Sequence, residues 1–156
     1  MDFRRITRVK NITDKLHEKD KREAYFGKNV GDKFKLHYPD KYRGNILKTN
    51  KGDYIVLYQT MGINNEKYVT HLVRTIDNKE APEEKKPNYK YGRMVELIAF
   101  VKKEIPYKET LFKNLNFTNK GWGYAASFEN EKFVPQDKLE KLQKHLVEIF
   151  KPYMVK

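Results

Sequence analysis

The sequence lacks several residue types on which common enzyme chemistries depend. It contains no cysteine, which excludes disulfides, thiolate nucleophiles and cysteine-ligated zinc. Ser127 is the only serine and stands outside any Gly-x-Ser-x-Gly turn, so nucleophilic catalysis by serine has no support. The segment Gly121-Trp122-Gly123 lacks the Gly-Lys-Ser/Thr ending of a phosphate-binding loop.

Long apolar runs are also missing. The segment after Met1-Asp2-Phe3-Arg4-Arg5 has no apolar stretch of the kind that follows the basic start of a signal peptide. No run is long enough to span a bilayer. We therefore expect a cytoplasmic protein with no membrane partner.

Histidines are few and scattered. His17, His37, His71 and His145 show no metal-ligand spacing. We expect neither a metal site nor a cofactor.

Positive charge, in contrast, is abundant. Lys and Arg number 33 against 21 acidic residues, a formal net charge of +12. Residues 1–51 hold 15 basic and 7 acidic residues, so most of the surplus lies in the first third of the chain. A basic surface attracts phosphate backbones without reading sequence, and this favours DNA or RNA as partner. The contacts are expected from residues 1–28, namely Arg4, Arg5, Arg8, Lys10, Lys21, Arg22 and Lys28.

Patterns of apolar residues predict an α+β fold with a compact, antiparallel, barrel-like sheet. Period-two or β-branched runs predict strands near 33–38, 53–60, 67–76 and 93–102. Pro135 suits a first helical turn, and Leu139, Leu142, Leu146 and Ile149 then recur at helical spacing up to Pro152. An amphipathic helix over about 136–150 is therefore expected to cover the sheet.

The domain organisation is predicted to be simple. The length suits a single domain over 1–156, because no repeat or linker divides it. Residues 1–24 are expected to be a basic N-terminal arm, which includes either a short strand within 3–12 or a free segment. The barrel core is expected over about 25–128 and the C-terminal helix over about 135–151. The charged, proline-bounded loop 77–88 is long enough to be functional or mobile.

Four segments resemble the PUA-like superfamily, and within it the EVE and YTH-like modules. They are Gly52-Asp53-Tyr54-Ile55-Val56-Leu57-Tyr58, then Tyr68-Val69-Thr70-His71-Leu72-Val73, the strand from Met94 to Val101, and Gly121-Trp122-Gly123-Tyr124. The resemblance covers about residues 25–128. The chain departs from the family in lacking a tryptophan at the start of the N-terminal strand and in having only Trp122.

The resemblance implies a twisted β-barrel with flanking helices that binds RNA or DNA. Related modules hold a modified base in an aromatic pocket, and some act beside prokaryotic restriction systems, so a partner protein of a restriction or defence system is expected. In this chain the pocket is predicted to hold a modified or flipped base between aromatic faces. Its predicted residues are Tyr58, Gln59, His71, Trp122 and Tyr124.

Two other functions remain open at this stage. Asp40, Glu83 and Lys85 imitate the Pro-Asp…Glu-x-Lys arrangement of metal-dependent nucleases, although Glu-x-Lys arises often by chance in a chain that is 35% charged. Alternatively, the basic surface could meet an acidic protein, which would make the chain a protein-interaction subunit. A non-enzymatic nucleic-acid-binding module is the favoured prediction.

Overall fold

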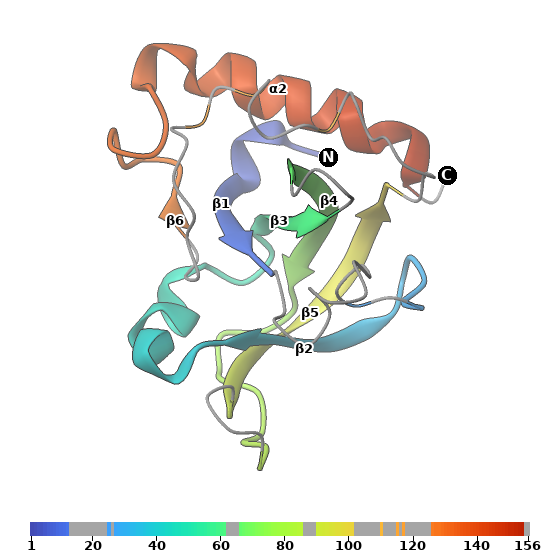
Figure 1. The fold of residues 1–156 in the computed structure, drawn as a ribbon, viewed down its shortest axis with the longest axis vertical. Helices are drawn as coiled ribbons and strands as arrows, with labels where there is room; N and C mark the ends of the chain where they lie inside the picture. The colour runs from blue at the N-terminus through green and yellow to red at the C-terminus, as the bar shows by residue number, and fades with distance from the viewer. Residues whose placement is uncertain are drawn as a thin grey trace.

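The computed structural model describes residues 1–12, 25, 27–61, 66–85, 90–101, 110, 115, 117 and 126–154. These residues form one sheet, short 3-10 helices and a C-terminal α-helix (Figure 1). The strands are β1 (Ile6–Asn11), β2 (Lys33–Tyr38), β3 (Tyr54–Met61), β4 (Glu66–Thr75), β5 (Tyr91–Phe100) and β6 (Ala126–Ser127). The helices are η1 (Phe3–Arg5), η2 (Asp40–Lys48), η5 (Gln136–Lys138), α2 (Leu139–Phe150) and η6 (Lys151–Tyr153).

The α+β class and the main predicted elements are confirmed. Strands β2 to β5 match the predicted ranges within two residues at each end, and β3, β4 and β5 form the expected antiparallel meander. The predicted C-terminal helix consists of η5 followed by α2. The stretches 13–24 and 118–125, which contain part of the predicted arm and the glycine-flanked tryptophan, lie outside the described residues.

The prediction of a purely antiparallel sheet is wrong, because β1 runs parallel to β3. The strand order is β2-β5-β4-β3-β1-β6, and Val9 stands opposite Val56 in the parallel pair. Part of the predicted arm is therefore a sheet strand with a long-range partner. The sequence of β1 mixes basic and apolar residues, so its pattern did not reveal the pairing.

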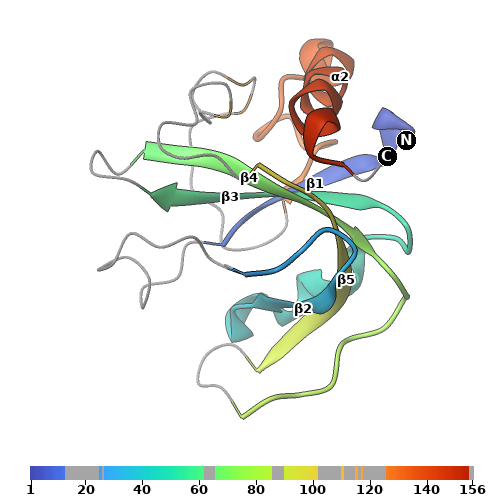
Figure 2. The same cartoon turned by 90° about the vertical axis from the view of Figure 1, so that its right-hand side faces the viewer.

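The sheet is strongly curled. Its ladders are irregular between Ile6 and Arg8, between Leu57 and Tyr58, and between Leu72 and Val73, and irregularities of this kind increase local twist. The curl brings β1 toward β2, although three strands separate them in the sheet order. The Lys10 Nζ of β1 lies 5.1 Å from the ring centre of Tyr38 in β2. Figure 2 shows the resulting half-barrel from the side.

Two apolar cores lie on the two faces of this sheet. On the outer face, Val9, Val56 and Leu72 pack with Leu142 and Leu146 of α2. On the inner, concave face, Leu36, Ile55 and Leu97 pack together with Tyr38 of β2 and with Ile12, which follows β1. Helix α2 lies across the outer face (Figures 1 and 2), as its apolar stripe predicts. Each fully buried leucine or valine contributes about 1.5–3 kcal/mol to folding.

A buried arginine ties η2 to the sheet. Arg93 of β5 is fully buried, and its Nη1 donates to the carbonyl oxygens of Ile46 at 3.0 Å and Thr49 at 2.5 Å. Its Nη2 donates to the Asp77 carbonyl at the start of the long loop. Backbone carbonyls thus accept hydrogen bonds from both terminal nitrogens of this guanidinium. These bonds hold η2 and the loop to β5 at one end of the half-barrel.

The loop after β4 is held to the sheet at several points in its described part. Arg43 of η2 makes a two-pronged contact with Glu80, both bonds measuring 3.1 Å. Lys35 of β2 donates to the carbonyl of Pro82 at 2.6 Å, and Glu84 Oε2 accepts from His37 Nε2 at 3.0 Å. Within the described part of the chain, no helix has both the length and the apolar content required to cross a membrane.

Candidate functional site

The described members of the predicted base pocket are buried in the sheet. Tyr58 and Gln59 lie within β3 rather than at its end, and their exposed fractions are 0% and 1%. Tyr58 belongs to the outer core, whereas His71 stacks on Phe100 of the inner core with ring centres 4.4 Å apart. The structure therefore does not bring Tyr58 and His71 to one opening. Trp122 and Tyr124 lie outside the described residues, and their pocket role stays a prediction.

A short hydrogen-bond relay fixes the His71 ring. The Gln59 amide donates to Thr70 Oγ1 at 3.0 Å, and Thr70 Oγ1 lies 2.7 Å from His71 Nδ1. When the Thr70 hydroxyl donates to Nδ1, the proton of the neutral ring resides on Nε2. Burial lowers the pKa of His71 to about 3, so the ring is neutral at physiological pH. His71 Nε2 is buried without a hydrogen-bond partner in the described structure.

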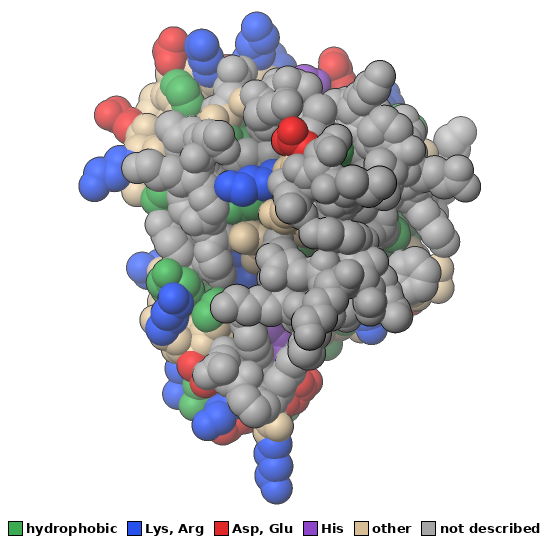
Figure 3. Space-filling view, in the orientation of Figure 1, with side chains coloured by type: hydrophobic (Ala, Val, Ile, Leu, Met, Phe, Trp, Pro, Cys, Tyr) green, Lys and Arg blue, Asp and Glu red, His purple; other side chains and the backbone are tan. Residues whose placement is uncertain are grey.

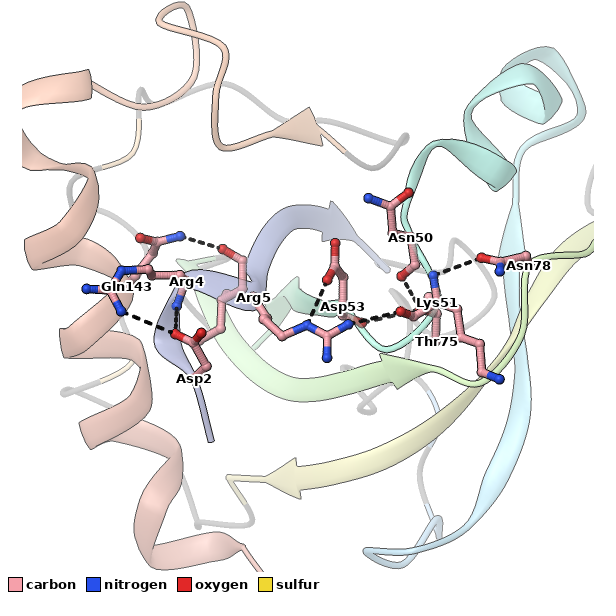
Figure 4. A network of polar contacts seen from close by, with 10 residues as sticks. Asp2, Arg4, Arg5, Asn50, Lys51, Asp53, Thr75, Asn78 and Gln143 are labelled. Carbon is pink, nitrogen blue, oxygen red and sulfur yellow. Dashed lines mark hydrogen bonds and ion pairs between the residues drawn. The ribbon is translucent and has the colours of Figure 1, made fainter.

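Arg5, one of the predicted phosphate contacts, is engaged in a structural clamp. Its Nε donates to Asp53 Oδ1 at 3.1 Å, and its Nη2 donates to the Lys51 carbonyl at 3.0 Å (Figure 4). The clamp holds η1 against the turn before β3. Gly52 makes the close approach possible, because a Cβ on Gly52 would lie 2.6 Å from Arg5 Nη2.

The other N-terminal cations differ in exposure. Arg4 is exposed beside Asp2, with the two side chains 3.8 Å apart. Arg8 is half-buried and donates to the Lys48 carbonyl at 3.3 Å, and burial lowers its pKa. Lys28 is half-buried with its Nζ 5.6 Å from the Phe34 ring centre. Lys21 and Arg22 lie outside the described residues.

Lys10 is not at the surface. Only 3% of it is exposed, its Nζ donates to the Asn11 carbonyl at 3.1 Å, and burial lowers its pKa to about 7. The amine therefore does not lie on the outer surface of the protein. Lys10 was expected on a projecting N-terminal arm. Its segment is instead β1, which lies between β3 and β6 in the sheet.

A line of cations does follow the N-terminal segment across the molecule. We call it the basic strip, and it consists of Arg4, Arg5, Arg8, Lys48, Lys51 and Lys144. At one end, the Phe3 ring lies 4.7 Å from Arg4 and 5.2 Å from Lys144 of α2. The contacts of Arg5 and Arg8 with the Lys51 and Lys48 carbonyls continue the strip to the end of η2.

The strip also contains carboxylates. Asp2 lies beside Arg4, Asp53 pairs with Arg5, and Glu140 lies 2.9 Å from Lys144. The strip therefore keeps a surplus of positive charge rather than a purely basic surface. On the face drawn in Figure 3, blue Lys and Arg side chains around the rim stand among red Asp and Glu side chains. Sequence reasoning missed Lys48, Lys51 and Lys144, because only the folded sheet places them beside the N-terminal segment.

The residues of the nuclease alternative lie around the long loop. Asp40 Oδ1 accepts from the Lys90 backbone nitrogen at 3.0 Å, and Lys90 in turn accepts from Glu84 N at 3.0 Å. Glu83 and Lys85 are exposed on the same loop. Within the described residues, no three His, Asp or Glu side chains form a group that could hold a metal ion.

Chemically, the arrangement offers a neutral buried imidazole, a buried amine and a surface line of cations. The cations can contact anions, and the strip draws them from four elements, namely η1, β1, η2 and α2. Comparisons with protein-family models, curated proteins and solved structures found no match to this chain.

Proposed function

We propose that the chain is a non-enzymatic nucleic-acid-binding module that contacts the phosphate backbone of DNA or RNA through the basic strip. The observation that carries the proposal is the convergence of cations from η1, β1, the end of η2 and α2 along one line. The net charge of +12 supports it, because a basic surplus draws polyanions before any specific contact forms.

Contacts of this type give affinity without sequence preference. Lys48 and Lys51 are exposed at the surface, and Lys144 and Arg4 stand at the other end of the strip. Each phosphate that a cation neutralises releases condensed counterions, so affinity falls steeply as salt is added. The slope of log affinity against log salt concentration therefore measures how many phosphates the strip contacts.

The proposal is tested by measuring fluorescence anisotropy of labelled DNA and RNA oligonucleotides over a salt series. The test variant replaces Lys48, Lys51 and Lys144 by Gln. Loss of phosphate contacts should weaken binding and reduce the slope of log affinity against log salt by about one for each contact. The fold should persist, because these three side chains are exposed.

A matched control replaces Lys79, Lys85 and Lys90 by Gln. These lysines are also exposed and lie on the loop between β4 and β5, so the net charge falls equally in both variants. The control should bind nearly as well as the unaltered protein. Equal losses of affinity in both variants would show that binding depends on net charge alone and would reject the strip as the interface. No affinity for DNA or RNA at low salt would instead favour an acidic protein partner.

We also propose that the module is PUA-like and that Trp122 and Tyr124 hold a modified or flipped base, with a restriction or defence system as its setting. Support for the fold relation comes from the curled sheet with its β3-β4-β5 meander. Support for the pocket comes from the sequence pattern Gly121-Trp122-Gly123-Tyr124. Tyr58, Gln59 and His71 would act in such a pocket through the sheet that they stabilise, since all three are buried.

A further inference from the structure

The seam where β1 meets β2 contains polar groups that the strip does not use. These two strands stand apart in the sheet order, and the curl brings Lys10 of β1 over the ring of Tyr38 in β2 at 5.1 Å. Both residues are buried, with exposed fractions of 3% and 0%. No β-ladder joins β1 to β2 in the described structure, so the seam is closed by side chains.

The hydrogen-bonding capacity at the seam is incompletely used. Lys10 Nζ has three N–H donors, and its hydrogen bond to the Asn11 carbonyl uses one. The Tyr38 hydroxyl is buried and has no partner in the described structure. Leaving such a group unpaired destabilises the folded state by about 1–3 kcal/mol, so a buried hydroxyl without a partner calls for an explanation.

Two guanidinium groups lie near the Tyr38 hydroxyl. Burial raises the pKa of Tyr38, and nearby Arg93 and Arg8 partly oppose that rise. Burial also lowers the pKa values of Arg8 and Arg93. Among the described residues, the buried polar and charged side chains include no Asp or Glu. The Lys10 amine and two guanidinium groups thus lie near the Tyr38 side chain, and the one carboxylate beside Arg93, Asp77 at 4.0 Å, is partly exposed. An anion at the seam would stabilise this arrangement.

We propose that the seam binds one small oxyanion of the phosphate or sulfate class, with Lys10 Nζ and Tyr38 Oη donating to its oxygens. Arg8 and Arg93 supply positive potential, while their own guanidinium groups stay tied to backbone carbonyls. A tetrahedral oxyanion accepts several hydrogen bonds at once, and it compensates the cations that no buried carboxylate balances. The site shares Arg8 with the basic strip, but its donors Lys10 and Tyr38 are not part of the strip, so phosphate binding to the seam does not depend on nucleic-acid binding.

Isothermal titration of the whole chain with inorganic phosphate, and separately with inorganic sulfate, tests the proposal. We expect saturable binding of one ion per chain. Lys10→Met keeps the length of the side chain and removes the donor, and Tyr38→Phe removes only the hydroxyl. Each substitution should weaken binding roughly ten-fold or more, as expected for loss of a hydrogen bond to a charged group. Lys141→Met on the exposed face of α2 is the control and should bind like the unaltered chain.

Two readouts separate the possible sources of the oxyanion. If the natural ligand is a terminal phosphate, a 5′-phosphorylated oligonucleotide will bind more tightly than its 5′-hydroxyl counterpart and will compete with phosphate. If it is a free ion, the two oligonucleotides will bind equally while phosphate still binds. The proposal fails if neither ion binds, or if Lys10→Met and Tyr38→Phe, both folded by circular dichroism, bind the ions as tightly as the unaltered chain. Failure of oligonucleotide binding alone would reject the proposed function and leave the oxyanion site intact.

Discussion

Lys10 shows most clearly how one residue's role depends on its surroundings. In the sequence it is one of several cations in a basic segment, and it was predicted to contact phosphate from an exposed arm. In the fold it lies inside the half-barrel, where burial lowers the pKa of its amine to about 7 from the ordinary 10.5. No local pattern distinguishes it from Arg4 or Arg5, because its burial depends on Tyr38, a residue of a distant strand.

Because the pKa of Lys10 is lowered in the folded protein, we predict that stability increases as the pH is raised above 7. Between pH 7 and 10.5 the unfolded chain binds a proton at Lys10 that the folded chain does not bind, so the free energy of unfolding rises with pH across that window. From pH 7 to 9 the gain from this residue is about 2 kcal/mol. Urea unfolding at the two pH values measures it. The amine lies over the Tyr38 ring and donates to the Asn11 carbonyl.

The same measurement on Lys10→Met should lose this gain, and the variant should be more stable than the unaltered chain near pH 7. Lys51→Met, at an exposed position, should keep the profile of the unaltered chain. Parallel profiles for the unaltered chain and Lys10→Met would mean that the amine keeps its ordinary pKa in the folded protein.

At the scale of elements, the spacing of apolar residues predicted those strands and helices whose own sequences determine them. Lys33–Tyr38 alternates polar and apolar residues, and Leu139–Phe150 repeats its leucines at helical spacing, so both elements were predicted near their observed bounds. Strand β1 could be predicted only as a strand or an arm. Its parallel pairing with β3 is set by residues about fifty positions away, and no spacing within β1 encodes that partner.

Gly92 of β5 gives a prediction at this scale. A Cβ at Gly92 would lie 2.2 Å from the Leu36 carbonyl oxygen of β2, a backbone atom that cannot rotate away. Gly92→Ala should therefore force β2 from β5 and lower the free energy of unfolding by about 1–3 kcal/mol. Thermal and urea unfolding measure the loss.

Gly44 in η2 provides the matched control for this substitution. A Cβ at Gly44 would meet no atom within 4 Å, so Gly44→Ala should change stability by less than about 1 kcal/mol. Equal effects of the two substitutions would show that the contact between β2 and β5 at Gly92 is looser than described.

At the scale of the whole molecule, one sheet supports two cores. Leu146 of α2 lies in the outer core and Leu97 of β5 lies in the inner core, and both side chains are fully buried. The strands that face one core on one side face the other core on the opposite side. We therefore expect the two cores to unfold together rather than in separate steps.

The substitutions Leu146→Ala and Leu97→Ala test this expectation. Each removes a buried side chain and should lower the free energy of unfolding by about 2–5 kcal/mol. In both variants, tryptophan fluorescence and far-ultraviolet circular dichroism should report the same single transition. Two separate transitions in the Leu146→Ala variant would show that α2 detaches before the sheet unfolds.

The basic strip and the seam could not be predicted from sequence for a reason that belongs to this scale. The strip joins Arg4 to Lys144, and the seam joins Lys10 to Tyr38 across three intervening strands. Composition predicted a basic surplus, and it could not place that surplus. Which cations reach the surface depends on how far the sheet curls, and the curl depends on bulges and register that many residues set together.

The hydrogen bond from the Gln143 amide of α2 to the Ile6 carbonyl of β1, at 2.9 Å, has a consequence for the order of assembly. The two residues are 137 positions apart, so β1 is synthesised well before the helix that covers it. At the usual rate of translation the interval is roughly 7–30 s. Until then Ile6 and Val9 have no α2 to shield them, and the parallel pair with β3 must close a long loop before it forms. Strand β1 is therefore the sheet strand that waits longest for its covering helix, and it is a segment that a nascent-chain chaperone would protect.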